Sequence, residues 1–124
     1  MKDLTLIIPA KNEISCIDFV LKGLEELKEN FNILIVVDNN KDNTLEIDLS
    51  KYNLNINFLV TNKNGFGNAI SEGVAKSITD YVCVFNADGS FDPKSLNKMY
   101  SELQNNDFVF CSRYQKHGSS DDDT

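Results

Sequence analysis

The sequence is poor in the residues that define several common classes of protein. Its three cysteines, Cys16, Cys83 and Cys111, are too few and too scattered for a disulfide framework or a zinc site. Two of them lie inside apolar, strand-like runs, which is typical of buried, reduced thiols and indicates the cytosol. The single histidine, His117, lies in a polar segment and has no serine or cysteine partner in a recognisable nucleophile motif. These absences argue against a disulfide-rich, zinc-binding or histidine-dependent hydrolytic protein.

Basic residues and long apolar runs are scarce as well. The chain has 12 Lys and Arg against 19 Asp and Glu, a formal net charge of -7, and it shows no basic patch or stripe. We therefore expect no nucleic-acid partner. A phosphate-bearing substrate is compatible with this charge, because a divalent cation can bridge acidic residues to a diphosphate. No apolar run approaches the ~20 residues that cross a bilayer, and no signal peptide is present, so we expect at most one soluble, cytoplasmic domain.

Two glycine-rich phosphate-binding motifs are also missing. Gly65 and Gly67 match the first two glycines of a dinucleotide fingerprint, but the third position holds Ile70. The turn also follows the third expected strand, whereas the fingerprint belongs after the first. No P-loop pattern occurs in the sequence. We therefore reject a dehydrogenase and a P-loop nucleotidase.

Residues 81–93 (YVCVFNADGSFDP) combine the clearest structural and chemical signals in the chain. The run begins with β-branched and aromatic residues, which is how a strand buried on both faces of a parallel sheet reads. It becomes polar at Asn86 and offers Asp88 before Gly89. A carboxylate just past a buried strand lies where open α/β sheets bind ligands. Asp-Gly is also a common turn pair, so Asp88 alone fits a ligand site and a simple turn about equally. Asp92-Pro93 is interpreted as a helix cap and first helical position.

Strand-like and helix-like segments alternate along the chain. Apolar runs predict strands at residues 4–9, 33–38, 56–60, 81–85 and 107–112. Helical periodicity predicts helices at residues 14–29, at 45–51 more weakly, at 69–77 with Ala69, Ile70, Gly73, Val74 and Ser77 on one face, and at 96–103. This alternation predicts a three-layer α/β/α fold with a mostly parallel sheet. Right-handed crossovers then place the carboxyl end of every strand along one edge.

Polar and charged groups collect at that edge of the expected sheet. They are Pro9 to Glu13, Asp38, Asn86 to Asp88, and Arg113. Such a collection favours a binding cleft over an isolated turn. Mg²⁺ or Mn²⁺ takes oxygen ligands and commonly keeps only one or two from protein, a role that suits Asp88, with Asn86 adding a neutral oxygen or orienting a water. Such an ion would neutralise charge on a departing diphosphate.

The neighbouring part of this cleft suits a nucleoside. Asp38 could accept hydrogen bonds from a nucleobase or ribose, and Gly65 and Gly67 could let the backbone approach it.

Five segments in this order resemble the family 2 glycosyltransferases with the GT-A fold, nearest to the polyprenyl-phosphate (dolichol-phosphate) mannosyl- and glucosyltransferases. They are residues 8–13 (IPAKNE), 36–44 (VVDNNKDNT), 64–69 (NGFGNA), 86–93 (NADGSFDP) and 112–114 (SRY). The resemblance implies metal-assisted, inverting transfer of a sugar from a GDP- or UDP-sugar to an acceptor. A polyprenyl phosphate is one candidate acceptor, which would put the protein at the cytoplasmic face of a membrane.

Individual roles follow from the same resemblance. Pro9, Lys11 and Glu13 would line the nucleotide pocket, with Gly65 and Asn86 beside them, and Asp38 would contact the base. Asp88 would be the metal ligand of the D-x-D motif. Arg113 would hold the acceptor phosphate, and its alternative role is a strand-end partner for the carboxylates.

The sequence departs from the family pattern in two ways. Asn86 replaces the first acid of D-x-D, and the acidic pair usual after the second strand is Asp38-Asn39. Family domains also continue further, so residues 1–116 are expected to be the nucleotide-sugar-binding part. Residues 117–124 form a polar tail, which is expected to be the start of an acceptor-binding part. The rest of that part is expected to be missing from this sequence, as in a fragment of a longer enzyme. A non-catalytic nucleotide-sugar binder therefore remains an alternative function. A sugar-nucleotide pyrophosphorylase is disfavoured, because it would need a Gly- and Arg-rich loop after the first strand, and residues 10–13 (AKNE) do not provide one.

Overall fold

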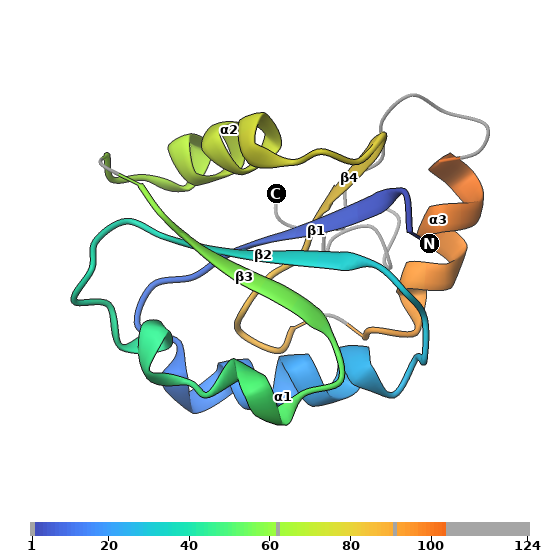
Figure 1. The fold of residues 1–124 in the computed structure, drawn as a ribbon, viewed down its shortest axis with the longest axis horizontal. Coiled ribbons are helices and arrows are strands. Elements are labelled where there is room, and N and C mark those ends of the chain that lie inside the picture. The colour runs from blue at the N-terminus through green and yellow to red at the C-terminus, as the bar shows by residue number, and fades with distance from the viewer. Residues whose placement is uncertain (1, 62, 91, 104–124) are drawn as a thin grey trace.

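The chain folds into a parallel sheet flanked by helices (Figure 1). The structure is a computed structural model that describes residues 2–61, 63–90 and 92–103. The strands are β1 (Leu4–Pro9), β2 (Asn32–Val37), β3 (Asn55–Val60) and β4 (Tyr81–Val84), and the helices are α1 (Ile14–Glu25), α2 (Phe66–Lys76) and α3 (Ser95–Leu103). Two short 3-10 helices, η1 (Asn43–Glu46) and η2 (Leu49–Lys51), lie between β2 and β3. No helix of the described residues is long and apolar enough to span a membrane.

The four strands are all parallel, in the order β3-β2-β1-β4. The chain therefore moves outward from β1 to β3 and then returns through α2 to place β4 on the other side of β1. The register is continuous across the centre, where Ile7 of β1 pairs with Leu34 of β2 and with Val84 of β4. Because the strands are parallel, all four carboxyl ends lie on one edge, and the strand order reverses between β1 and β4.

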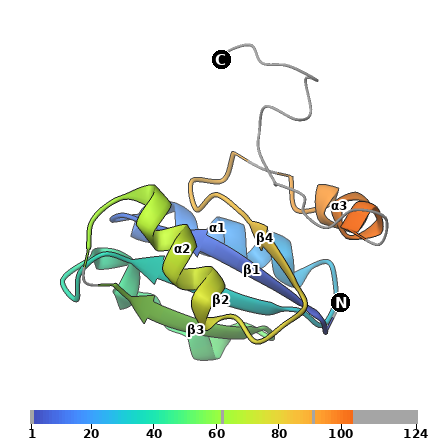
Figure 2. The same cartoon turned by 90° about the horizontal axis from the view of Figure 1, so that it is seen from above.

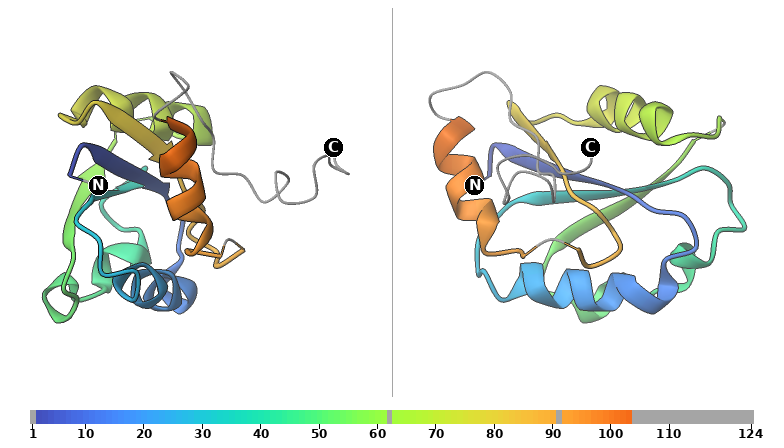
Figure 3. Two further views of the ribbon diagram at one scale, coloured as in Figure 1. Left: turned by 90° about the vertical axis from the view of Figure 1, so that its right-hand side faces the viewer. Right: turned by 180° about the vertical axis from the view of Figure 1, so that it is seen from behind.

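Helices cover both faces of the sheet, as the views in Figures 1 and 2 show, with α1 on one face and α2 on the other. Alternate residues of β1 point to opposite faces. Leu6 and Ile8 belong to the larger core cluster beneath α1, whereas Ile7 packs with Val36 and Ala69 beneath α2. Figure 3 shows α3 at one end of the sheet beside β1 and β4. The expected three-layer α/β/α fold is confirmed.

α2 approaches the sheet closely because of a glycine. A Cβ atom added at Gly73 would lie 2.8 Å from Cγ2 of Ile7, whose side chain is fully buried. Ala69, one helical turn earlier, is buried on the same face. Val74 was expected on that face but is exposed, because it lies one residue further round the helix than Gly73. Ser77 follows the end of the helix instead of belonging to it.

Two predicted helices differ from the structure. The predicted helix 14–29 ends at Glu25, and the chain turns where Lys28 adopts a left-handed φ of 55°. The predicted helix 45–51 is wrong and is replaced by η1 and η2. Asp42 and Asp48 each accept a hydrogen bond from the backbone N–H two residues ahead. Such local bonds favour tight turns over a continuous α-helix. The strand predicted at 107–112 lies outside the described residues.

Candidate functional site

A pocket opens at the carboxyl edge of the sheet. Its volume is about 360 Å³. The residues that line it come from all four strand ends or the segments after them, and they are Pro9, Ala10, Lys11, Glu13, Val36, Asp38, Gly65, Phe66, Ala69, Asn86, Ala87 and Asp88. Seven of the eight residues predicted for the site are in this set. The eighth, Arg113, lies outside the described residues, and its role stays a prediction.

The strand order explains why the two key carboxylates share one pocket. Asp38 directly follows β2, and Asp88 lies four residues after β4. Because β1 lies between these two strands, the turn that carries Lys11 and Glu13 lies between the two acids. Gly65 reaches the pocket from the start of α2, with φ 113° and ψ 145°, a conformation open almost only to glycine. The prediction that Asp38 and Asp88 face one shared space is confirmed.

The acidic turn after β4 is closed by its own side chains. The Ser90 N–H donates to Oδ1 of Asp88 at 2.9 Å, and Nδ2 of Asn86 donates to Oγ of Ser90 at 3.5 Å. Gly89 takes a positive φ of 80°, and a Cβ atom there would lie 3.3 Å from the ring of Phe19. The turn therefore holds the exposed Asp88 carboxylate at the pocket.

Asp92 has a different role from Asp88. Its Oδ1 accepts the Lys94 N–H at 3.0 Å just before α3, and it does not line the pocket. The Asp92 carboxylate therefore caps the turn that leads into α3. The prediction of Pro93 as the first helical position is wrong, because α3 begins at Ser95.

The amino end of α1 is capped by side chains from thirty residues further along the chain. We call residues 42–44 the α1 clamp. The Asn12 N–H donates to both carboxylate oxygens of Asp42, each at 3.0 Å. The Glu13 N–H donates to Oγ1 of Thr44 at 2.9 Å. Asn43 completes the set, because its Oδ1 accepts the Ile14 N–H at 3.2 Å.

The clamp joins the segments that follow β1 and β2. Asn12 also accepts the Asn43 N–H through its Oδ1 at 3.1 Å. Asp42 is only 4% exposed and Thr44 is fully buried, so these two acceptors are largely shielded from water, whereas Asn12 is exposed. Sequence reasoning treated this segment only as a turn. Two features could have indicated the clamp: α1 has no side-chain cap from its own N-terminal residue, and residues 42–44 are types that commonly cap helices.

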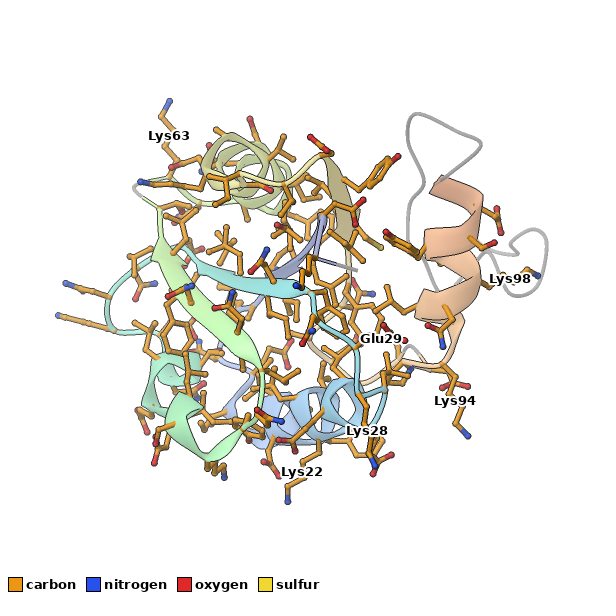
Figure 4. The ribbon with its side chains drawn as sticks, turned by 45° about the vertical axis from the view of Figure 1, so that its right-hand side comes forward. Lys22, Lys28, Glu29, Lys63, Lys94 and Lys98 are labelled. Atoms are coloured by element: carbon orange, nitrogen blue, oxygen red, sulfur yellow. The ribbon has the colours of Figure 1, made fainter. Side chains whose placement is uncertain are left out.

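The pocket carries an excess of negative charge. Partial burial raises the pKa of Glu13, and the nearby carboxylates of Asp88 and Asp42 raise it further. Among the described residues, Lys11 is the only cation that lines the pocket. The lysines labelled in Figure 4 extend outward from the body of the molecule and are Lys22, Lys28, Lys63, Lys94 and Lys98. A diphosphate would therefore be repelled unless a cation entered with it.

The donor set in this pocket fits a hard cation that shares its ligands with a substrate. No group of three or more His, Cys, Asp or Glu side chains in the described part of the chain could hold a metal ion alone. Asp88 and Asn86, whose side chains contain oxygen atoms, nevertheless line one pocket. Mg²⁺ is commonly held by one or two carboxylates together with substrate phosphates and waters. Bound phosphates would thus have to complete such a site.

Sequence reasoning missed the apolar part of the pocket. Val36, Ala69 and Ala87 are buried and form its wall, whereas Phe66 lines it with 57% of its surface exposed. The position of Phe66 between Gly65 and Gly67 was visible in the sequence, but the spatial relation of α2 to the end of β2 was not.

A second opening lies at the other edge of the sheet. Its volume is about 470 Å³, and Asn32 and Asn55, the first residues of β2 and β3, help to line it. None of the predicted site residues that the structure describes borders it.

Comparison with known proteins identifies the family of this chain. The family described as "Glycosyl transferase family 2" matches residues 5–124. An uncharacterized glycosyltransferase of Mycobacterium tuberculosis is 29% identical over 99 residues, which is 80% of this chain and 43% of that protein. A dolichyl-phosphate beta-glucosyltransferase of Dictyostelium discoideum is 32% identical over 110 residues, which is 77% of this chain and 34% of that protein.

A solved structure shows the same fold. S. aureus TarS, residues 1–349, superposes with a TM-score of 0.65 at 23% identity, covering 85% of this chain and 33% of that one. The fold is thus an α/β fold of the GT-A glycosyltransferase type. The chain belongs to glycosyl transferase family 2. It spans less than half the length of the relatives named above.

Proposed function

We propose that this chain binds the nucleotide-diphosphate sugar of a glycosyltransferase and takes part in transfer of that sugar to an acceptor. The observation that carries the proposal is the convergence of seven expected site residues on one pocket at the carboxyl edge of a parallel sheet. Ligands bind at this edge in open α/β folds. Membership of glycosyl transferase family 2 supports the same function.

The pocket offers distinct places for the two ends of a nucleotide diphosphate. Asp38 would accept a hydrogen bond from the base, and Gly65 would let the nucleoside approach the backbone. Lys11 would pair with the diphosphate, near Pro9 and Glu13 in the turn after β1. Asp88 would hold a divalent Mg²⁺ or Mn²⁺ ion, with Asn86 beside it. When bound, that ion supplies Lewis-acid stabilisation of the diphosphate.

The proposed reaction is an in-line displacement with inversion at the anomeric carbon. The acceptor oxygen forms a new bond to that carbon as the bond to the diphosphate oxygen breaks, and negative charge moves onto the departing nucleoside diphosphate. Lys11 lines the pocket, and its positive charge would stabilise the leaving group. The name of the Dictyostelium relative supports a polyprenyl phosphate as the acceptor. We propose that this acceptor is met at a membrane surface and that Arg113 holds its phosphate.

Calorimetric titration of the 124-residue chain with UDP and with GDP tests the donor half of this proposal. We expect binding of at least one nucleotide in the presence of Mn²⁺ and loss of that binding with EDTA. Asp88→Asn should abolish the Mn²⁺ dependence, because it keeps an acceptor for the Ser90 N–H but removes the charge. Asp80→Asn is the matched control, since Asp80 is exposed and does not line the pocket. Nucleotide binding that is indifferent to Mn²⁺ and to Asp88→Asn would contradict the site assignment.

A non-catalytic nucleotide-sugar binder is the second candidate function. The observation that favours it is Asn86, which brings an uncharged amide to the position beside Asp88. The two functions are separated by incubating the chain with UDP-glucose or GDP-mannose, Mn²⁺ and a polyprenyl phosphate. Release of nucleoside diphosphate excludes the non-catalytic alternative, and donor binding without any release favours it.

A further inference from the structure

Phe66 is the only aromatic residue that lines the pocket in the described part of the chain. Its side chain keeps 57% of its surface exposed. Phe19 and Ile78 are also exposed, but neither lines the pocket. A single exposed apolar side chain needs no explanation by itself. An exposed flat ring at the wall of a polar pocket, however, offers a face on which a planar ligand can stack.

The position of Phe66 on α2 directs it to one end of the pocket. Residues three apart lie on one face of a helix, so Phe66 shares a face with Ala69. Ala69 packs on Val36 of β2 in the smaller core cluster. Asp38 follows Val36 by two residues and is already beyond the end of β2. Phe66 therefore lies over the end of β2, on the same side of the pocket as Asp38.

The other end of the pocket carries the acidic turn. Asp88 and Asn86 follow β4, which is separated from β2 by the whole width of β1. The diphosphate and its cation belong at this end, because the oxygen donors are here and Lys11 stands between the two ends. The part of the ligand that reaches Asp38 and Phe66 is then the part furthest from the metal, which is the base.

We propose that Phe66 is the stacking platform for the nucleobase, with Asp38 as the polar partner at the base edge. This inference rests on the proposed function, since it concerns the same pocket. A ring contact recognises the flat face that every base has, whereas a carboxylate accepts only from a base N–H. Phe66 thus contributes affinity for the nucleoside, and Asp38 contributes selectivity among bases.

The test compares a nucleotide with a ligand that has no base. Wild-type protein and Phe66→Ala are titrated with Mn²⁺ and either UDP or GDP, whichever binds more tightly, and with Mn²⁺ and inorganic pyrophosphate. Loss of one base–aromatic stack should weaken nucleotide binding by about five- to 150-fold, while pyrophosphate binding stays unchanged. Ile78→Ala is the control for an exposed apolar side chain, since Ile78 is 97% exposed and lies away from the pocket.

Conservative variants separate stacking from simple bulk. Phe66→Trp should restore nucleotide affinity, because it keeps a flat aromatic face, and Phe66→Leu should not. Because the chain has no tryptophan, Phe66→Trp also adds a single fluorophore whose emission should change with nucleotide but not with pyrophosphate.

Each outcome decides one of the two proposals. Equal nucleotide affinity in wild-type protein and Phe66→Ala would overturn the stacking role and leave the proposed function standing. Equal weakening of nucleotide and pyrophosphate would also overturn it, because the substitution would then act on the whole pocket. Failure of wild-type protein to bind either nucleotide would overturn the proposed function, and the stacking role with it.

Discussion

Replacement of Asp42 by alanine should destabilise the protein by about 2–4 kcal/mol, although this residue lies outside the pocket. The substitution removes the acceptor for two backbone donors, the Asn12 N–H at 3.0 Å and the Thr44 N–H at 2.8 Å. Hydrogen bonds to a charged group contribute about 1.5–3 kcal/mol each. Thr44 is fully buried, so its N–H would lose its partner without access to water. Asn12 is exposed, and its N–H would recover part of the loss from solvent.

The assay is urea unfolding followed by circular dichroism at pH 7. A domain with a typical stability of about 5–15 kcal/mol remains mostly folded after such a loss, so the variant should show a lowered midpoint with an unchanged slope. Asp48→Ala is the matched control. Asp48 likewise accepts the backbone N–H two residues ahead, that of Ser50, at 3.0 Å. Unlike Asp42, it is exposed and does not cap α1.

The comparison between the two aspartates tests the reasoning about the clamp. We expect Asp48→Ala to cost much less than Asp42→Ala, because water replaces the lost acceptor. Equal losses in the two variants, or a negligible loss in Asp42→Ala, would refute the claim that residues 42–44 fix the start of α1. Nucleotide affinity should also fall in Asp42→Ala, since the clamp positions Glu13 and the turn that carries Lys11.

Two further predictions concern packing and charge. Gly73→Ala should destabilise the fold by about 1–3 kcal/mol, because the new methyl group would overlap the buried Ile7. Gly67→Ala is the matched control in the same urea unfolding assay. A Cβ atom at Gly67 meets no atom within 4 Å, so this variant should be neutral or stabilising. Glu13→Gln should raise the free energy of unfolding at pH 7. Burial and neighbouring acids raise the pKa of Glu13 above its ordinary 4.5, so the native state disfavours the charged form of this side chain. This gain should disappear as the pH falls below about 4.5, where Glu13 is protonated in both states, and a gain independent of pH would contradict the electrostatic cause.

The sequence was sufficient to predict the sheet and the edge where polar groups meet. Strands buried on both faces appear as continuous apolar runs, and β1, β2 and β4 have such runs. Because parallel crossovers bring strand ends to one edge, the positions of Asp38 and Asp88 followed from the order of elements alone. Seven predicted site residues line the pocket for this reason, although Gly67, which was expected beside the nucleoside, does not.

The remaining features depend on contacts between segments distant in sequence. The α1 clamp joins residues about thirty positions apart, and no local pattern reports which loop will supply a cap. The exposed position of Phe66 depends on how far α2 extends beyond the end of β2. Periodicity also failed to find the end of α1, because Leu27 still packs against the core from the turn that follows the helix.

The most direct test of the account is an NMR titration of isotope-labelled protein with Mg²⁺ and UDP or GDP. We predict that the largest amide shifts occur in the turns after β1, β2 and β4 and at the start of α2, including Glu13, Asp38, Gly65 and Asp88. Amides near Asn32 and Asn55, at the other opening, should not move. Shifts confined to that opposite edge, or no shifts at all at saturating nucleotide and Mg²⁺, would contradict the assignment of the donor site.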